Sequence, residues 1–299
     1  MRRPTDRASQ AAFTLVEMIV SIVIGGILVA MVAMFGRWQI QSYFDVSNRA
    51  DLTDSADTAL RRITRELQGA LPNSVRVRQS GSNYYLEFVP IVDAGRYRAN
   101  SGLSGTDNTL DFSPSNDTSF QVLGPSVTAT ANQQLVVYNL GIPRPTAGLS
   151  GTAGLSGSDV YEGDNRRAIP AGFSGTTVTF SGTGVSFPFA SPANRFHIVD
   201  GPVSFECAPN PANPALGQLV RHWCYDFQAA QPAGFSLLAY AGCTSAQQAV
   251  LVANVESCQI YYDGVPALQR NGLVTIDLTL SANGERVNLL HQVEIMNTP

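Results

Sequence analysis

The pattern of hydrophobic and polar positions divides the start of the chain into two kinds of predicted helix. An uninterrupted apolar run covers residues 13–35, and Glu17 is its only charged residue. These roughly 23 residues would form a helix about 34 Å long, enough to cross a bilayer core of about 30 Å. The run therefore predicts a membrane-spanning helix.

Charges and small residues beside this run indicate its orientation and its processing. Three arginines and a single aspartate precede it, which predicts a cytoplasmic N-terminus and an exported C-terminal part. A conventional cleaved secretory signal is the alternative, and it requires a shorter apolar run followed by a small-x-small site. Here Ala11 and Ala12 stand before the run instead.

The helical pattern continues beyond the apolar run in an amphipathic form. Apolar residues recur at steps of three and four, as expected for one buried helix face, and charged residues occupy the other faces. The apolar positions are Leu52, Ala56, Ala59, Leu60, Ile63, Leu67, Ala70 and Leu71. We expect one helix from about Phe13 to Ala70, which Pro72 terminates.

Beyond Pro72 the apolar positions alternate with a period of two, which is typical of β-strands. Seven segments show this pattern: Ser74–Arg78, Tyr84–Val89, Leu135–Tyr138, Thr177–Phe180, Phe196–Val199, Val203–Cys207 and Leu219–Phe227. The clearest hairpin is the last, in which Asn283-Gly284 separates two alternating runs. The sequence predicts an α+β fold, a long N-terminal helix packed on an antiparallel β-sheet domain with loop-rich insertions.

Three near-identical pentapeptides at Gly102–Thr106, Gly148–Thr152 and Gly154–Ser158 interrupt this pattern. Their composition predicts mobile surface loops. A receptor-contacting tip loop is the alternative.

The charge composition bears on nucleic-acid binding as a possible function. The net charge is −4, with 19 basic and 23 acidic residues, so nothing favours nucleic-acid binding. All of the basic residues are arginines.

Four cysteines, Cys207, Cys224, Cys243 and Cys258, lie in the part that we expect to be exported. Because that compartment is oxidising, we expect two disulfides. Three connectivities are possible. We favour Cys207–Cys224 and Cys243–Cys258, because each pair flanks a short excursion between predicted strands.

The sequence holds no recognisable catalytic or metal-binding motif. No CxxC or HxxxH spacing accompanies His222 and Cys224, so no metal site is expected. His197, His222 and His291 lie in strand-like segments, and nucleophile elbows, phosphate loops and dinucleotide fingerprints are absent. We predict that the protein is not an enzyme and needs no cofactor.

The start of the apolar run carries a specific resemblance. Residues 12–19, which read AFTLVEMI, resemble the signature of type IV prepilins. The resemblance implies that a prepilin peptidase cuts between Ala12 and Phe13 and methylates the new N-terminus at Phe13. It further implies that Glu17 is an assembly residue, whose carboxylate pairs with the ammonium of a neighbouring subunit's Phe13. The family usually has glycine before the cut, where this chain has Ala12.

A second resemblance covers both ends of the exported part. Residues 51–77, 85–88 and 95–98 and the closing 27 or so residues look like the minor pilins of MSHA pilus biogenesis, the MshO family. This implies a low-copy subunit that acts in pilus initiation or at the pilus tip. Its partners would be the major pilin, other minor pilins and the assembly platform of the bacterial inner membrane.

Together these patterns predict four segments: a leader (1–12), a membrane or filament-core helix (13–35), its amphipathic continuation (36–71) and a β-rich periplasmic or extracellular domain (72–299). The chain would cross the inner membrane once before it enters the pilus. A type II secretion minor pseudopilin and a tip adhesin remain as alternative functions.

Overall fold

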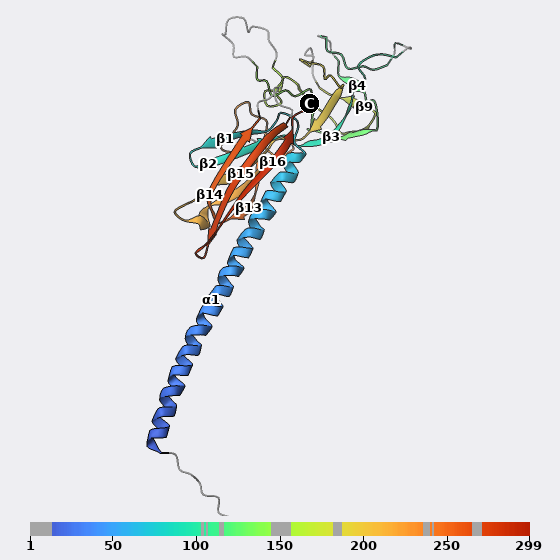
Figure 1. Cartoon of the computed structure of the whole chain (residues 1–299). Helices are drawn as coiled ribbons and strands as arrows, with labels where there is room; N and C mark the ends of the chain where they lie inside the picture. The colour runs from blue at the N-terminus through green and yellow to red at the C-terminus, as the bar shows by residue number, and fades with distance from the viewer. Residues whose placement is uncertain are drawn as a thin grey trace, which may run out of the picture. The chain divides into compact units, whose positions relative to one another are not determined.

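The computed structural model describes residues 14–102, 105, 107–113, 117–144, 157–181, 187–235, 240, 242–264 and 271–299, with the backbone alone at 36–39. These residues belong to two compact units, Met1–Asp51 and Leu52–Pro299. The helix α1 (Leu15–Gln68) passes from the first unit into the second (Figure 1).

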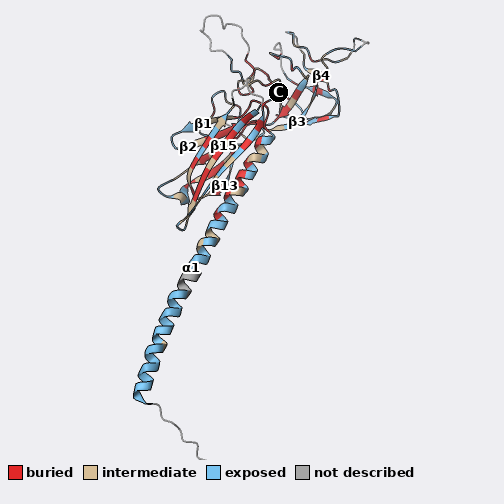
Figure 2. Cartoon of the chain, viewed as in Figure 1, coloured by how far each residue is buried: buried red, intermediate tan, exposed pale blue. Residues whose placement is uncertain are grey.

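In the second unit, α1 is amphipathic in the way that the sequence predicts. Its buried positions are those of the apolar stripe from Leu52 to Leu67, and Figure 2 shows them along its last turns. The helix ends two residues before the predicted Ala70. Its last turn tightens there, since the Gly69 and Ala70 amides donate to the carbonyls of Glu66 and Leu67.

Two antiparallel sheets share one hydrophobic core with this helix face. The first sheet has the strand order β1-β2-β11-β12-β13. Its strands are β1 (Arg76–Ser80), β2 (Asn83–Phe88), β11 (Val203–Ala208), β12 (Gln218–Trp223) and β13 (Gln247–Ala253). Alternate residues such as Leu86, Phe88 and Phe205 join the core that contains Ile63 and Leu67.

The second sheet, β14-β15-β16, contains the predicted hairpin. Its strands are β14 (Val255–Asp263), β15 (Asn271–Ala282) and β16 (Glu285–Met296). Asn283 and Gly284 have φ angles of 55° and 84° and connect the opposed residues Ala282 and Glu285. Both residues of a type I′ turn need positive φ, so the Asn-Gly prediction is confirmed.

A further β region has its own aromatic core, which includes Tyr97, Phe120, Phe180 and Phe196. One sheet has the order β3-β10-β6-β7, and β4-β9 and β5-β8 form two short pairs. The strands are β3 (Ile91–Arg96), β4 (Ser119–Gln121), β5 (Val127–Ala129), β6 (Gln134–Val137), β7 (Arg166–Ala168), β8 (Phe173–Gly175), β9 (Thr177–Thr179) and β10 (Arg195–Val199). A short 3₁₀ helix, η1 (Pro214–Leu216), precedes β12. A long helix followed by antiparallel sheets confirms the α+β prediction.

Most of the repeated pentapeptide sequence lies outside the described residues. The last residue of the third copy, Ser158, is described and does not fit a mobile loop. It is fully buried, and its hydroxyl donates to the carbonyl of Tyr138 at 2.6 Å. The surface-loop prediction is therefore wrong at this residue.

The favoured disulfide pairing is wrong. The structure pairs Cys207 with Cys258 and Cys224 with Cys243. Cys207 lies opposite Leu219 in the sheet, so Cys224 is five residues further along, about 17 Å at 3.4 Å per residue. A disulfide requires Cα atoms within about 7 Å, which excludes the predicted Cys207–Cys224 bond.

Each observed disulfide joins elements that the fold brings together. Cys207 on β11 and Cys258 on β14 have Cα atoms 6.4 Å apart. Their disulfide links the two sheets within the core that they share with α1. Cys224 follows β12 directly with a φ of 64°, which turns the chain toward Cys243. That second bond closes the excursion that connects β12 with β13.

Candidate functional site

The first turn of α1 contains the one carboxylate of the apolar run. The Glu17 amide donates to Oγ1 of Thr14 at 3.3 Å, and the Met18 amide donates to the Thr14 carbonyl at 3.2 Å. Thr14 thus caps the helix, and Thr14-x-x-Glu17 has the spacing of a capping box. This spacing is the signal by which the sequence alone would locate Thr14 as the helix cap. The Glu17 side chain itself is exposed.

The apolar residues that follow have no burial partner in the described part of the chain. Leu15 and Phe35 are 76% and 73% exposed, and the large apolar side chains between them are exposed as well. Long uninterrupted apolar surface of this kind requires lipid or other apolar helices around it. By length and composition α1 is suited to cross a membrane, which supports anchoring there.

The exposed apolar surface extends beyond the predicted limit at Phe35. Ile40, Tyr43, Phe44 and Val46 are all exposed, and the Tyr43 and Phe44 rings meet edge to face with centroids 6.1 Å apart. Aromatic side chains are common where a membrane helix reaches the interface. A span that ends at the last strictly apolar residue, Phe35, leaves this extension out.

The predicted cleavage site, Ala12 and Phe13, lies outside the described residues. The described geometry therefore begins immediately after it, at Thr14. Because Phe13 is not among the described residues, the structure gives no distance from the Glu17 carboxylate to the predicted new N-terminus.

On the globular unit, polar side chains gather on the face of the first sheet opposite the helix. Glu206 accepts hydrogen bonds from Tyr85 at 2.9 Å and Asn83 at 3.0 Å, and its other oxygen lies 2.8 Å from Nε2 of His222. Burial alone would raise the pKa of Glu206, but the hydrogen bonds from His222, Tyr85 and Asn83 outweigh it and lower the pKa. The His222 ring also stacks on Phe235, with centroids 4.2 Å apart.

A buried ion pair lies beside this network. Glu87 is fully buried and accepts hydrogen bonds from Arg76 at 2.5 Å and from Tyr225 at 2.8 Å. Burial raises its pKa, although Arg76 opposes the shift. The Arg76 guanidinium also lies 3.5 Å from the Tyr161 ring centroid and donates to the carbonyls of residues 228 and 229. These contacts hold the segment after β12 over the sheet.

The other two histidines also lie in strands, as the sequence predicts. His197 is on β10, where burial, with the charge of Arg195, lowers its pKa to about 4. His291 is on β16, with Nε2 2.7 Å from the hydroxyl of Thr64. Within the described residues, no group of three or more His, Cys, Asp or Glu side chains is placed to hold a metal ion.

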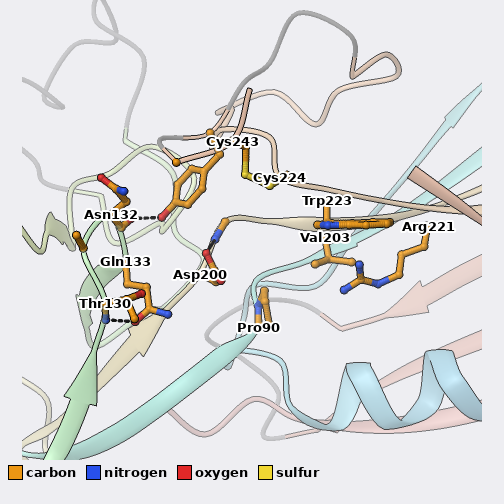
Figure 3. Close-up of a pocket in the computed structure, with 14 residues that line it drawn as sticks. Pro90, Thr130, Asn132, Gln133, Asp200, Val203, Arg221, Trp223, Cys224 and Cys243 are labelled. Atoms are coloured by element: carbon orange, nitrogen blue, oxygen red, sulfur yellow. Dashed lines mark hydrogen bonds between the residues drawn. A yellow bond between two sulfur atoms is a disulfide. The ribbon is translucent and has the colours of Figure 1, made fainter. Parts of the chain in front are cut away.

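A cavity of about 270 Å³ with a mixed polar and apolar lining lies beside the Cys224–Cys243 disulfide (Figure 3). Asp200 lies between the 130–133 segment and Trp223, and Arg221 lies beside Trp223, with its guanidinium 4.8 Å from the ring. Arg221 is already engaged by Glu66 at 2.9 Å. The charges around the cavity are therefore partly satisfied within the protein.

Comparison with known proteins gives one match, at the N-terminus. Residues 7–33 match the family model described as "Prokaryotic N-terminal methylation motif". Neither the curated proteins nor the solved structures contain a match to the chain. The motif, which overlaps the exposed apolar start of α1, supports a type IV pilin-like or pseudopilin-like protein that the prepilin-processing machinery recognises.

Proposed function

We propose that this protein is a minor type IV pilin of the MSHA type, a structural subunit that initiates pilus assembly or stands at the pilus tip. The observation that carries the proposal is the methylation motif at residues 7–33, which contains most of the exposed apolar start of α1. A helix with apolar residues on every side requires a lipid or protein environment, and a pilus subunit encounters both. The large β-rich part favours a low-copy subunit, because a fibre of many copies is built from compact ones.

In this proposal the peptidase cleaves between Ala12 and Phe13, and Phe13 becomes the methylated first residue. Glu17 then lies one turn into the mature helix. Its carboxylate pairs with the ammonium of a neighbouring subunit's Phe13 in the apolar interior of the assembly. Either charge alone would be costly there, so the pair specifies how deeply neighbouring helices overlap.

The MSHA assignment rests on the resemblance of residues 51–77 and of the closing hairpin to the MshO family. Those residues form the buried end of α1, the start of β1, and the strands β15 and β16. The partners are the major pilin, other minor pilins, the prepilin peptidase and the inner-membrane assembly platform. The N-terminus remains cytoplasmic before processing, and the β-rich domain (72–299) is periplasmic until the subunit enters the pilus.

The first test is the state of the mature N-terminus. Mass spectrometry of the chain purified from membranes should give a terminal peptide that begins at Phe13 and carries one methyl group. A conventional secretory signal would instead give a terminus beyond Phe35. That result would overturn the proposal.

Two alternatives share parts of this structure. A type II secretion minor pseudopilin would carry the same N-terminal motif, and a tip adhesin would add a receptor site such as the cavity beside Trp223. Deletion of the gene separates the three. Loss of surface pili supports the minor pilin, loss of secretion with intact pili supports the pseudopilin, and intact pili without attachment support the adhesin.

A further inference from the structure

The outer edge of β16 is long and regular. All twelve residue pairs between β15 and β16 are in continuous register, without a bulge, and β16 contains no proline. Proteins usually protect such edges with bulges, prolines or covering segments, because a free strand edge can pair with another chain. β16 contains neither a bulge nor a proline, and among the described residues no segment pairs with its outer edge.

The register shows which backbone groups of β16 point outward. Ala282 and Glu285 form the pair that closes the two-residue turn, so odd-numbered residues from 285 onward bond to β15. The N–H and C=O groups of the even-numbered residues 286–296 point to the free edge. Within the part of the chain that the structure describes, none of these groups has a backbone partner.

A groove of about 360 Å³ runs beside the end of this edge. Thr64 and Gln68 of α1 line one side, and Gln292, Glu294 and Met296 of β16 line the other. Glu294 is the only charged side chain among the described residues that line it. Leu290 and Met296 add exposed apolar surface, at 64% and 72% exposure.

We propose that this groove accepts an extended segment of a neighbouring pilin-like subunit, which adds a strand to β16. Evenly spaced backbone donors and acceptors fit an extended polypeptide, since strand addition draws its affinity from main-chain hydrogen bonds and its specificity from alternate side chains. The segment carries a basic residue opposite Glu294 and an apolar residue against Met296. The inference rests on the proposed function, because it requires assembly with other subunits.

A second copy of this chain fits the groove less well. Antiparallel pairing of β16 with β16 would direct the last turns of the two α1 helices in opposite directions, since each helix packs on its own sheet. Subunits that are anchored in one membrane by the same N-terminal segment point the same way. This argues against β16–β16 pairing of two copies, and we assign the groove to a different subunit.

The test uses a photoreactive benzoylphenylalanine in place of Leu290 in the full chain, in cells that assemble pili. Tyr261→benzoylphenylalanine on β14 is the matched control, because Tyr261 is exposed on the same face of the same sheet. Irradiation should cross-link position 290 to one extended segment of another pilin-like subunit, with at least tenfold lower yield from position 261. A link to this chain itself, to a second copy or to lipid would overturn the proposal.

Backbone variants then test the strand pairing. Gln292→Pro removes an outward N–H and leaves the ladder to β15 intact, whereas Gln292→Thr changes the side chain alone. The proline should lower the cross-link yield at least tenfold and the threonine less than twofold; equal yields would contradict strand addition.

Formation of the Cys207–Cys258 disulfide shows that the Gln292→Pro variant has folded. If that bond does not form, amide hydrogen exchange of the wild-type chain tests the strand pairing instead. The wild-type amides of Gln292 and Glu294 should exchange at least tenfold more slowly in purified pili than in detergent, and equal rates contradict the pairing. Recovery of the chain in pili tests the proposed function separately.

Discussion

Asn73 and Asn297 are 224 residues apart in sequence and are joined by two hydrogen bonds. The Asn73 amide donates to Oδ1 of Asn297 at 3.3 Å, and Nδ2 of Asn73 donates to the Asn297 carbonyl at 3.2 Å. Nδ2 also reaches the Asn139 carbonyl at 3.0 Å. One buried side chain therefore connects the segment after α1 to the segment after β16 and to the β region that contains β6.

Asn73 also has a φ of 58°, so its replacement combines two effects. Asn73→Ala should lower the free energy of unfolding by about 2–4 kcal/mol, because it removes the buried side-chain hydrogen bonds and puts alanine, which tolerates left-handed backbone less well than asparagine, at this position. Asn73→Gly removes the same bonds without that strain and should cost about 1 kcal/mol less. Chemical denaturation followed by circular dichroism measures both. Equal losses in the two variants would show that the backbone conformation contributes nothing.

The two disulfides should contribute unequally to stability. They span separations of 51 and 19 residues, which correspond to about 4 and about 3 kcal/mol in the chain-entropy model. Replacing Cys207 and Cys258 together by alanine should therefore be the more destabilising change. Peptide mapping without reduction checks the pairing first, and a Cys207–Cys224 peptide would contradict the structure.

Glu206 and Glu87 should give opposite contributions to the pH dependence of stability. The folded-state pKa of Glu206 is lowered, so its contribution is present above about pH 4.5 and is lost as the pH falls through the folded pKa. Glu206→Gln should thus flatten the loss of stability in acid. The pKa of Glu87 is raised by burial, so protonation there favours the folded state as the pH falls toward 4.5. Glu87→Gln removes that gain and should steepen the acid loss.

Urea unfolding of the full chain in detergent, from pH 7 to pH 3, measures both slopes. Each variant is compared with wild type at the same pH, so a uniform loss of stability does not affect the result. Parallel curves for wild type and both variants would contradict the opposed pKa shifts.

Glu17→Gln tests the proposed role of Glu17 in assembly. The amide keeps the shape but removes the charge, so membrane insertion should be no worse. Docking should weaken by roughly 3–5 kcal/mol, because the ammonium of a neighbouring Phe13 would be buried without its partner. Co-purification with other pilins and the cleavage state of the chain are the two measurements.

Asp45→Asn is the matched control, since it removes a charge from the same helix outside the apolar run. It should leave co-purification unchanged. A cleaved and stable Glu17→Gln protein that is recovered with its partners at wild-type yield would contradict the role of Glu17.

Those parts of the fold that local pattern determines could be predicted from the sequence. Helix α1 follows from its apolar spacing and from Pro72, and the last hairpin follows from Asn283-Gly284. Strands β4, β5, β7 and β8 have three residues each and were not predicted, and neither were the longer strands β3, β13 and β14. Their positions depend on which strands pair with them, and sequence spacing does not reveal that pairing.

For the candidate site, local pattern singles out one residue. Glu17 stands out because a charge within an apolar run is rare. The cysteine pairing depends on which residues lie opposite each other in the sheet, and sequence spacing does not reveal that register. Likewise, Glu206 and His222 alternate with core residues as strand residues should, yet nothing local indicates that Phe235 covers them.

The bond between Cys207 and Cys258 has a mechanical consequence. If the chain acts as the proposed pilus subunit, tension on the pilus would pull it along its helix, and the buried face of α1 contacts both sheets. A helix held by two separate sheets could be peeled from one and then from the other, at a lower force for each step. The covalent link between β11 and β14 makes the two sheets share the load, so the helix must shear from both at once.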